Sequence, residues 1–460
     1  MRVSAIVSAG GILLAAAASL AIAEAQTPQP PAAPPAARGA PRDAAPTARM
    51  PLPPASEGNL DRLQQFRTTG TNLDLETVPQ DGRRADQLRQ NLERIRLPEG
   101  FRIELYAVVP DARHMAVGPS SGVVFVGTRK TRVWAVTDRD RDRVADDVKV
   151  FAPSVRFSVP NGPCFSPDGI LYIAEHNRVL AFPAAEFFYE GPDVATEVVV
   201  PQGRLIPAEE ESFNHGARVC RVGPDNKLYI SLGQPFNVPS PAKLEVFTRH
   251  GIGGIVRMDR DGKNREVYAR GIRNSVGIAF RPGTPELWFT DNQVDGMGDD
   301  TPPGEITRIT AAGQNFGFPW FGGGGVRTAD YRSATPPTDA VPPMVETSAH
   351  AADLGMMFYQ GRMFPAEYRG AIFSAQRGSW NRTTAVGARV MVTFLNPDTV
   401  LMGGGVWDSS DVIKDAARIG LDLTSHPDLR KSVRIVEGRL GSRAGVIGAA
   451  DLARRQLGSQ

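Results

Sequence analysis

Apolar and polar positions alternate in short runs along the middle of the chain, and four of these runs share one form. They are MAVGPSSGVVFVGT from residue 115, CFSPDGILYIAE from 164, CRVGPDNKLYISLG from 220 and IAFRPGTPELWFTDN from 278. Each run starts with apolar residues, passes through a proline-containing turn with Gly or Asn, and continues into an alternating strand. The pattern predicts a hairpin of two antiparallel strands in each unit.

The four hairpins recur at a regular interval. Their turn prolines, Pro119, Pro167, Pro224 and Pro282, are 48, 57 and 58 residues apart. A four-stranded blade with its loops needs about 40 to 50 residues, so the interval is typical of a β-propeller. A fifth, degenerate unit is expected around residues 368–382. In such a fold the innermost strands surround a central channel, and one set of loops gathers over its mouth.

Composition and charge fit a globular, turn-rich chain. The 460 residues are 41% hydrophobic, which is enough apolar material for one large or two ordinary domains. The 47 glycines and 38 prolines indicate many turns, as in an all-β protein. The formal net charge is only +2 without a lysine/arginine run, so the sequence offers no surface for nucleic acid.

The N-terminal residues have the composition of export and linker segments. Residues 1–25 combine Arg2, an alanine-rich apolar run and a small-residue site, which predicts a signal peptide and a periplasmic or secreted protein. An uncleaved membrane anchor is the less favoured alternative, and no later run is apolar enough to span a bilayer. Residues 26–57 predict a Pro/Ala-rich linker, and residues 58–96 predict an N-terminal helical arm.

Two cysteines, Cys164 and Cys220, occur in the whole chain, so disulfide bonds do not form its framework. A single bridge is one alternative. Two buried free thiols are the favoured interpretation, because both cysteines lie in strand-like runs far apart in sequence.

Polar side chains gather near the ends of the predicted strands. The set contains arginines, amides, one aspartate and one histidine: Asn161, Asn214, His215, Arg218, Arg273, Asn274, Asp291, Asn292, Arg377 and Arg382. Converging guanidinium groups bind carboxylates in bidentate fashion, so the set predicts a site for a planar polyanion. The histidine beside them is a candidate base.

A series of motifs in this region resembles the glucose/sorbosone dehydrogenase family. In chain order they are GIRNSVGIAF, ELWFTDN, DGMGDDTPPGEITRI, GQNFGFPW and GSWNR, and the similarity extends over roughly residues 95 to 406. Members of this family are six-bladed β-propellers that oxidise sugars with pyrroloquinoline quinone (PQQ). The resemblance implies an all-β, six-bladed propeller over residues 97–406, with PQQ- and calcium-dependent oxidation of a sugar or sugar aldehyde.

The resemblance also implies roles for individual residues. The segment NHGARVCRVGPDNKLYISLG matches the motif that carries the general base, which makes His215 the candidate for taking the hydroxyl proton while hydride passes to the quinone. The Arg273–Asn274 pair matches the family's cofactor contacts, and Asn292 aligns with a further contact. A salt bridge to a nearby Asp is the structural alternative for Arg273. The remaining candidates for cofactor binding are Asn161, Asn214, Arg377 and Arg382.

Calcium is expected in the loop that follows ELWFTDN. The resemblance places the backbone carbonyls of Gln293 and Val294 where relatives bind a calcium that bridges protein and quinone. Oxygen ligation of this kind suits a hard cation. Acidic side chains of the same region match one that holds a structural calcium in relatives: Asp295, Asp299, Asp300 and Glu305.

A second acidic stretch is DRDRDRVADD at residues 138–147. It spaces Asp138, Asp140 and Asp142 like a calcium loop but lacks the glycine at the sixth position. A solvated charged turn is therefore the favoured interpretation.

Two features depart from the family pattern. Relatives commonly carry a lysine on the blade that reads FYQGRMF here, where Gln360 supplies no charge, so Arg377 and Arg382 are the expected substitutes. The closing PDGxLYVxD hairpin is missing, and residues 407–460 instead predict an atypical helical tail.

Two other classes of function stay open. A calcium-dependent lactonase of the six-bladed type would spread Asp, Glu and Asn ligands over several blades, whereas this chain concentrates arginines at its strand ends. A non-catalytic propeller that binds a sugar or protein is favoured by the missing lysine and the missing closing hairpin. The sequence does not specify the substrate, the electron acceptor or the oligomeric state.

Overall fold

The computed structural model describes residues 4–8, 75–395, 399–403 and 434–437. The chain divides into two compact units, one formed by residues 55–394 and one by residues 1–54 together with 395–460. Each unit is described by itself.

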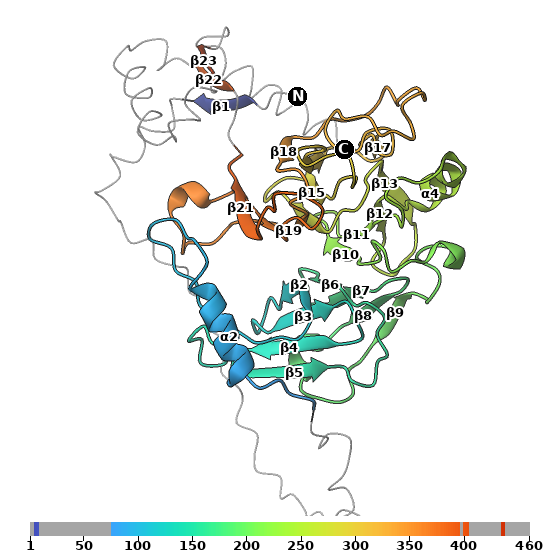
Figure 1. The fold of residues 1–460 in the computed structure, drawn as a ribbon. Helices are drawn as coiled ribbons and strands as arrows, with labels where there is room; N and C mark the ends of the chain where they lie inside the picture. The colour runs from blue at the N-terminus through green and yellow to red at the C-terminus, as the bar shows by residue number, and fades with distance from the viewer. Residues whose placement is uncertain (1–3, 9–74, 396–398, 404–433, 438–460) are drawn as a thin grey trace, which may run out of the picture. The chain divides into compact units, whose positions relative to one another are not determined.

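The larger unit is an all-β propeller, and its described residues form five blades (Figure 1). Blade 1 contains β2 Ala112–Val117, β3 Val124–Thr128, β4 Val133–Thr137 and β5 Asp147–Phe151. Blade 2 contains β6 Gly162–Phe165, β7 Leu171–Ala174, β8 Val179–Phe182 and β9 Glu197–Val200. Blade 3 contains β10 Val219–Val222, β11 Leu228–Leu232, β12 Gly254–Met258 and β13 Glu266–Arg270, with β17 Gln314–Asn315 added parallel to β13.

The last two blades follow the same order. Blade 4 contains β14 Gly277–Phe280, β15 Leu287–Asp291, β16 Gly304–Ile309 and β18 Val345–Thr347, and blade 5 contains β19 Asp353–Phe358, β20 Ile372–Gln376 and β21 Arg389–Thr393. Short helices lie around the blades: α2 Arg83–Leu92, α3 Ala185–Phe188, η5 Ala208–Glu210, η6 Pro241–Lys243, α4 Leu244–His250 and η7 Ala366–Tyr368. No helix in the described part of the chain has both the length and the apolar character needed to cross a membrane.

All four predicted hairpins are confirmed, as the pairs β2–β3, β6–β7, β10–β11 and β14–β15. Their tight turns require a residue with positive φ. Gly122, Gly169, Asn226 and Gly283 fill these positions with φ of 80°, 87°, 60° and 74°. This requirement explains why each repeat carries Gly or Asn after its proline, because these residues tolerate the left-handed region best.

The core lies between neighbouring blades. Leu171 and Phe182 of blade 2 pack with Phe125 and Phe151 of blade 1 in one buried cluster. Strands β7 and β11 are buried at every position, so both of their faces are covered. Stacking of blades face to face therefore replaces the half-buried alternation of an open sheet by continuous burial.

Cys164 and Cys220 form a disulfide bond, with Cα atoms 5.7 Å apart. The interpretation as free thiols was wrong. The two cysteines are 56 residues apart, which is about one blade repeat, and they occupy β6 and β10, the innermost strands of adjacent blades. In a repeat fold, equivalent positions one repeat apart are neighbours in space, so separation in sequence was the wrong criterion.

The predicted count of six blades is not confirmed, because five blades are formed by the described residues. The first and last of these approach each other at the channel, where a Cβ added to Gly355 of β19 would lie 3.4 Å from His114 Cε1 of β2. Farther out, Phe101 packs against Phe364 and Tyr368, with ring centroids 4.9 and 5.4 Å apart. The segment after α2 therefore contacts blade 5.

The smaller unit has one described sheet. Its strands, β1 Ser4–Ser8, β22 Thr399–Gly403 and β23 Arg434–Glu437, pair in parallel in the order β1-β22-β23. β23 corrects the expectation of a helical tail at its four residues. The rest of the expected tail, most of the expected signal peptide and the whole Pro/Ala-rich linker lie outside the described residues. Of the expected arm, the structure describes α2 and its flanks from residue 75 onward.

Candidate functional site

A cavity of about 560 Å³ lies where loops of all five blades converge. Nine of the predicted site residues line it: Asn161, Asn214, His215, Arg273, Asn274, Asn292, Gln293, Asp295 and Arg377. The other five predicted residues do not: Val294, Asp299, Asp300, Glu305 and Arg382. The structure thus brings together the polar strand-end residues of the sequence and leaves out most of the acidic ones.

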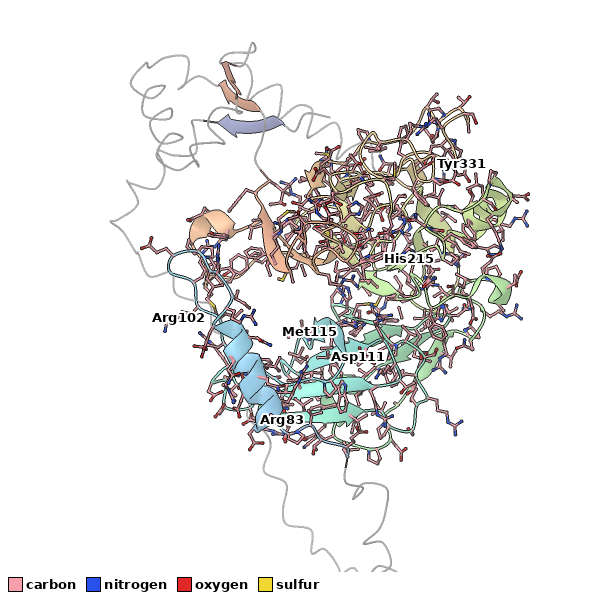
Figure 2. The ribbon with its side chains drawn as sticks, in the orientation of Figure 1. Arg83, Arg102, Asp111, Met115, His215 and Tyr331 are labelled. Carbon is pink, nitrogen blue, oxygen red and sulfur yellow. A yellow bond between two sulfur atoms is a disulfide. The ribbon has the colours of Figure 1, made fainter. Side chains whose placement is uncertain are left out.

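His215 lies in the loop before β10 and is labelled in Figure 2. Its Nδ1 lies 2.6 Å from the carbonyl oxygen of Gln234, which can only accept, so Nδ1 carries the proton and Nε2 is a free acceptor. Burial, and next the charge of Arg273, lower the pKa of His215 to about 4. The imidazole is therefore neutral at neutral pH, as a general base must be.

Arg218 fixes the loop that carries His215. Its guanidinium is buried and donates from Nε to the His176 carbonyl oxygen at 3.0 Å, and from one Nη to the carbonyl oxygens of His215 and Gly233 at 3.1 and 3.2 Å. His215 itself has a φ of 53°. These hydrogen bonds compensate the energetic cost of the left-handed conformation, which residues other than glycine rarely adopt.

Arg273 is held almost entirely by protein groups. It is 3% exposed and donates to both oxygens of Asn237, to the Asn292 carbonyl oxygen and to the Asp295 carboxylate, at 2.9 to 3.0 Å. The alternative interpretation, a salt bridge to a nearby Asp, is therefore realised by Asp295. Four of the five N–H donors are used, so a ligand contact by Arg273 would depend on one remaining donor.

Asp291 holds the backbone at Arg273 and Asn274 by hydrogen bonds. Its carboxylate accepts the backbone N–H groups of Arg273 and Asn274 at 2.9 and 2.7 Å. Burial raises the pKa of Asp291 to about 6, although these hydrogen bonds oppose the shift. The Asn274 side chain is left free, since its Oδ1 is buried and has no partner among the described residues.

The three other predicted asparagines differ in whether their side-chain amides already donate hydrogen bonds within the protein. They are Asn161, Asn292 and Asn214. Asn161 is buried and donates to the Arg218 carbonyl oxygen at 2.9 Å. Asn292 donates to the carbonyl oxygens of Asn274 and Asp353 at 3.1 and 2.8 Å. Asn214 is exposed beside His215. The first two amides therefore hold neighbouring blades together, and only Asn214 is open to a ligand.

The predicted acidic calcium set does not converge. Asp299 accepts hydrogen bonds from Thr383, and Asp300 is exposed and pairs with Arg382 at 3.1 Å. Glu305 is buried and accepts from the Gln293 side chain and the Gly324 backbone at 2.8 and 2.6 Å. Burial, then the charge of Asp291, raise the pKa of Glu305 to about 8. Each of these carboxylates thus has its own partner within the protein, and calcium binding by the set stays a prediction.

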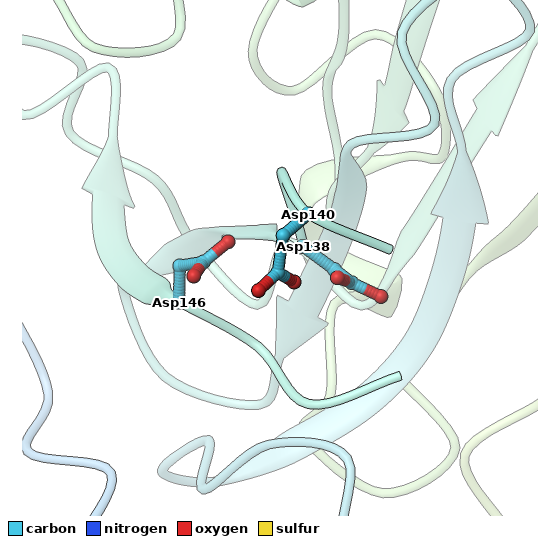
Figure 3. A group of neighbouring side chains, drawn as sticks. All are labelled: Asp138, Asp140 and Asp146. Atoms are coloured by element: carbon cyan, nitrogen blue, oxygen red, sulfur yellow. The ribbon is translucent and has the colours of Figure 1, made fainter. Parts of the chain in front are cut away.

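One group of three carboxylates does gather within the described residues. Asp138, Asp140 and Asp146 have oxygens within 4.8 Å of one another (Figure 3). The sequence spacing predicted Asp142 as the third member of this group, and the structure has Asp146 instead. The Asp142 carboxylate accepts the Val144 N–H at 2.7 Å. The group lies in an exposed loop of blade 1, outside the cavity.

The prediction for Arg382 is also corrected. Its guanidinium donates to the carbonyl oxygens of Asp299 and Thr384 and pairs with Asp300, so it braces one loop against another outside the cavity. Arg377, by contrast, lines the cavity and is exposed. Two arginines of the predicted fifth unit thus differ in their surroundings, since one lines the cavity and the other does not.

Several residues of the cavity wall were missed by sequence reasoning: Arg113, Arg129, Phe213, His350, Trp380 and Asn381. A signal existed for Arg129, which directly follows β3 as Asn292 directly follows β15. Residues just beyond the repeat hairpins were expected to converge on the channel mouth. Applying that expectation to the first repeat would have included Arg129.

The lining fits an anionic, planar ligand and a hard cation. Guanidinium groups of Arg129 and Arg377 have no side-chain partner among the described residues, and the amide of Asn274 is free. The carbonyl oxygens of Gln293 and Val294 accept no hydrogen bond from the described part of the chain. Carboxylates suit the first set of donors, and calcium suits such carbonyl oxygens.

Comparison with known proteins finds a family match over part of the propeller. Residues 195–379, which include His215, the Arg273–Asn274 pair and Arg377, match the family described as Glucose / Sorbosone dehydrogenase. The chain is thus similar to this family over that part of the propeller. An uncharacterized protein of Borreliella burgdorferi is 29% identical to it over 313 residues, which cover 66% of this chain and 78% of that protein.

Solved structures confirm the propeller fold of this chain. The calcium structure of a Trichoderma reesei carbohydrate-active enzyme of family AA12 has a TM-score of 0.54 and 18% identity, and covers 72% of this chain and 85% of its own. The iodide structure of a T. reesei family AA12 enzyme has a TM-score of 0.53 and 19% identity, with 65% and 82% covered.

Proposed function

We propose that this protein oxidises a sugar or sugar aldehyde with PQQ and calcium, and that His215 is the general base. One observation carries the proposal: His215 presents a free Nε2 in a cavity whose other walls supply arginine and amide donors. Similarity of residues 195–379 to the glucose/sorbosone dehydrogenase family supports it.

The residues present define where such a cofactor would be held. The Asn274 Nδ2 and the Arg377 guanidinium donate no hydrogen bond within the described residues and would bind its carbonyl and carboxylate oxygens. The carbonyl oxygen of Gln293, on the cavity wall, and that of Val294, just behind it, would be available to calcium. When bound, PQQ supplies the acceptor for the hydride of the substrate. Asp291 keeps the Arg273–Asn274 backbone in place, because its carboxylate accepts both backbone N–H groups.

His215 performs the proton transfer. Its Nε2 takes the proton of the substrate hydroxyl while Nδ1 stays bonded to Gln234, so the imidazolium that forms keeps its orientation. Arg273 disfavours this positive charge and Asp295 favours it. We also propose that the chain acts after export, as its N-terminal sequence predicts.

The test is calorimetric titration of the full-length protein with PQQ, with calcium and with a calcium chelator, followed by dye reduction with aldoses. We expect calcium-dependent binding and sugar-dependent turnover. Binding without turnover for any aldose or aldehyde would favour the non-catalytic propeller. No binding of PQQ in either condition would overturn the proposal.

A further inference from the structure

Two arginines of blade 1 lie on the cavity wall opposite the family motifs. Arg113 is the second residue of β2, and Arg129 follows the last residue of β3. Ala112 pairs with Thr128 in the register of these strands, so both arginines leave blade 1 at the same end. Both line the cavity.

These two guanidinium groups are largely unused within the protein. Arg113 makes a single contact, to Asp111 at 3.3 Å, and its side chain is 42% exposed. Arg129 is exposed and, among the described residues, its guanidinium has no hydrogen-bond or ion-pair partner. Asp111, labelled in Figure 2, accepts the backbone N–H of Arg129 at 2.8 Å and so holds the two positions together.

Other arginines of the same blade behave differently. Arg132 pairs with Glu76 at 3.0 Å, and Arg139 pairs with Asp147 and Glu190 at 2.6 and 2.7 Å. Neither lines the cavity. Among these arginines, only Arg129 has no carboxylate partner within the described residues, and Arg113 has one, Asp111 at 3.3 Å.

The carboxylates of the cavity wall do not neutralise this pair. Asp295 is bound by Arg273 and by Asn381 at 3.0 and 2.7 Å. Asp291 accepts two backbone N–H groups, and Asp353 accepts from Gln376 at 2.8 Å. Asp111 offsets one of the two charges, so the blade 1 side of the cavity keeps the positive charge of the second arginine for a ligand.

We propose that Arg113 and Arg129 form a carboxylate-binding site on the blade 1 wall. Guanidinium forks bind a carboxylate with two parallel hydrogen bonds, which a pair of adjacent arginines converging on one cavity can supply. The carboxylate belongs either to the quinone cofactor or to a sugar-acid substrate such as a uronate. The cofactor source rests on the proposed function, whereas the sugar-acid source can be tested without it.

The experiment compares Arg129→Gln, Arg129→Lys and Arg113→Gln with wild type, and uses Arg132→Gln as the matched control on the same blade. Each full-length variant is titrated calorimetrically with PQQ plus calcium, and separately with glucuronate and with glucose. Thermal unfolding checks that the variants stay folded.

We expect Arg129→Gln to weaken binding of one carboxylate ligand by about 10- to 100-fold, with Arg129→Lys in between, because charged hydrogen bonds are lost. Weaker PQQ binding assigns the site to the cofactor. Weaker glucuronate binding with unchanged glucose and PQQ binding assigns it to the substrate. If wild type fails to bind PQQ but binds glucuronate through Arg129, the proposed function fails and this site stands.

The proposal is overturned if Arg129→Gln and Arg113→Gln bind every probe as Arg132→Gln does. It is also overturned if wild type binds neither PQQ nor glucuronate.

Discussion

The two sides of the cavity use arginine in opposite ways. On the side of blades 3 and 4, Arg218 and Arg273 are buried and their donors are bonded to carbonyl oxygens, an amide and a carboxylate of the protein. On the side of blades 1 and 5, Arg129 and Arg377 are exposed and have no side-chain partner among the described residues. The arginine donors on the side of blades 3 and 4 are thus already bonded within the protein. Those on the side of blades 1 and 5 remain available to a ligand.

This difference predicts which property each substitution changes. Removing a buried, internally bonded arginine leaves its partners unsatisfied and lowers the stability of the fold. Removing an exposed, unpartnered arginine changes stability little and affects only what binds in the cavity. His215 stands between the two cases, since one ring nitrogen is bonded to the protein and the other is free.

The largest expected effect is that of His215→Gln on turnover. Loss of a positioned general base should lower sugar-dependent dye reduction by about 10²- to 10⁴-fold, with PQQ binding little changed. The measurement is steady-state kinetics with the cofactor and calcium supplied. His250→Gln, at the end of α4 and outside the cavity, is the control. Equal rates for the His215 variant and wild type would remove His215 from the mechanism.

Arg273→Ala should lower the free energy of unfolding by about 1 to 3 kcal/mol, because the buried oxygens of Asn237 and Asn292 would lose their donor. Arg273→Lys should lose less, since it keeps the charge without the planar fork. Arg129→Ala, on the opposite wall, should change the free energy of unfolding by no more than about 0.5 kcal/mol. Denaturant titration compares the three. A similar loss for Arg273→Ala and Arg129→Ala would contradict the distinction between the walls.

The disulfide bond between blades 2 and 3 should stabilise the fold. Replacing Cys164 and Cys220 together by Ala should lower the free energy of unfolding by about 2 to 4 kcal/mol, because the open chain gains freedom when unfolded. Wild type under reducing conditions should approach the double variant. The reductant-induced shift of the unfolding midpoint is measured for wild type and for the double variant. If the two shifts are equal, the bond does not stabilise the fold.

The smallest expected effect concerns pH. Because the pKa of His215 is lowered to about 4, the base stays unprotonated on mild acidification. The rate kcat/KM should therefore fall by only about 10% between pH 7 and pH 5, and steeply near pH 4 as Nε2 gains a proton. An imidazole in water, with a pKa near 6.5, would instead lose about 25-fold between pH 7 and pH 5. A pH profile with that early loss would show that His215 is not buried when substrate binds.

The sequence by itself determined the parts of this protein that depend on neighbours in the chain. The hairpins follow from alternation and from Gly or Asn at turns such as Gly169 and Asn226, where the backbone needs a positive φ. The repeat interval then placed the strand ends around one channel, which was sufficient to predict His215 and the Arg273–Asn274 pair on its wall.

The tertiary structure alone decided which of those polar groups are already satisfied. Arg273 is held by Asn237, 36 residues away, and Arg382 by Asp300, 82 residues away, so one became part of the wall and the other left the cavity. The Cys164–Cys220 bond likewise depends on two blades stacking. Partners of this kind are brought together by blade packing, and no local pattern records them, because a side chain's remaining hydrogen-bonding capacity depends on every group that reaches it.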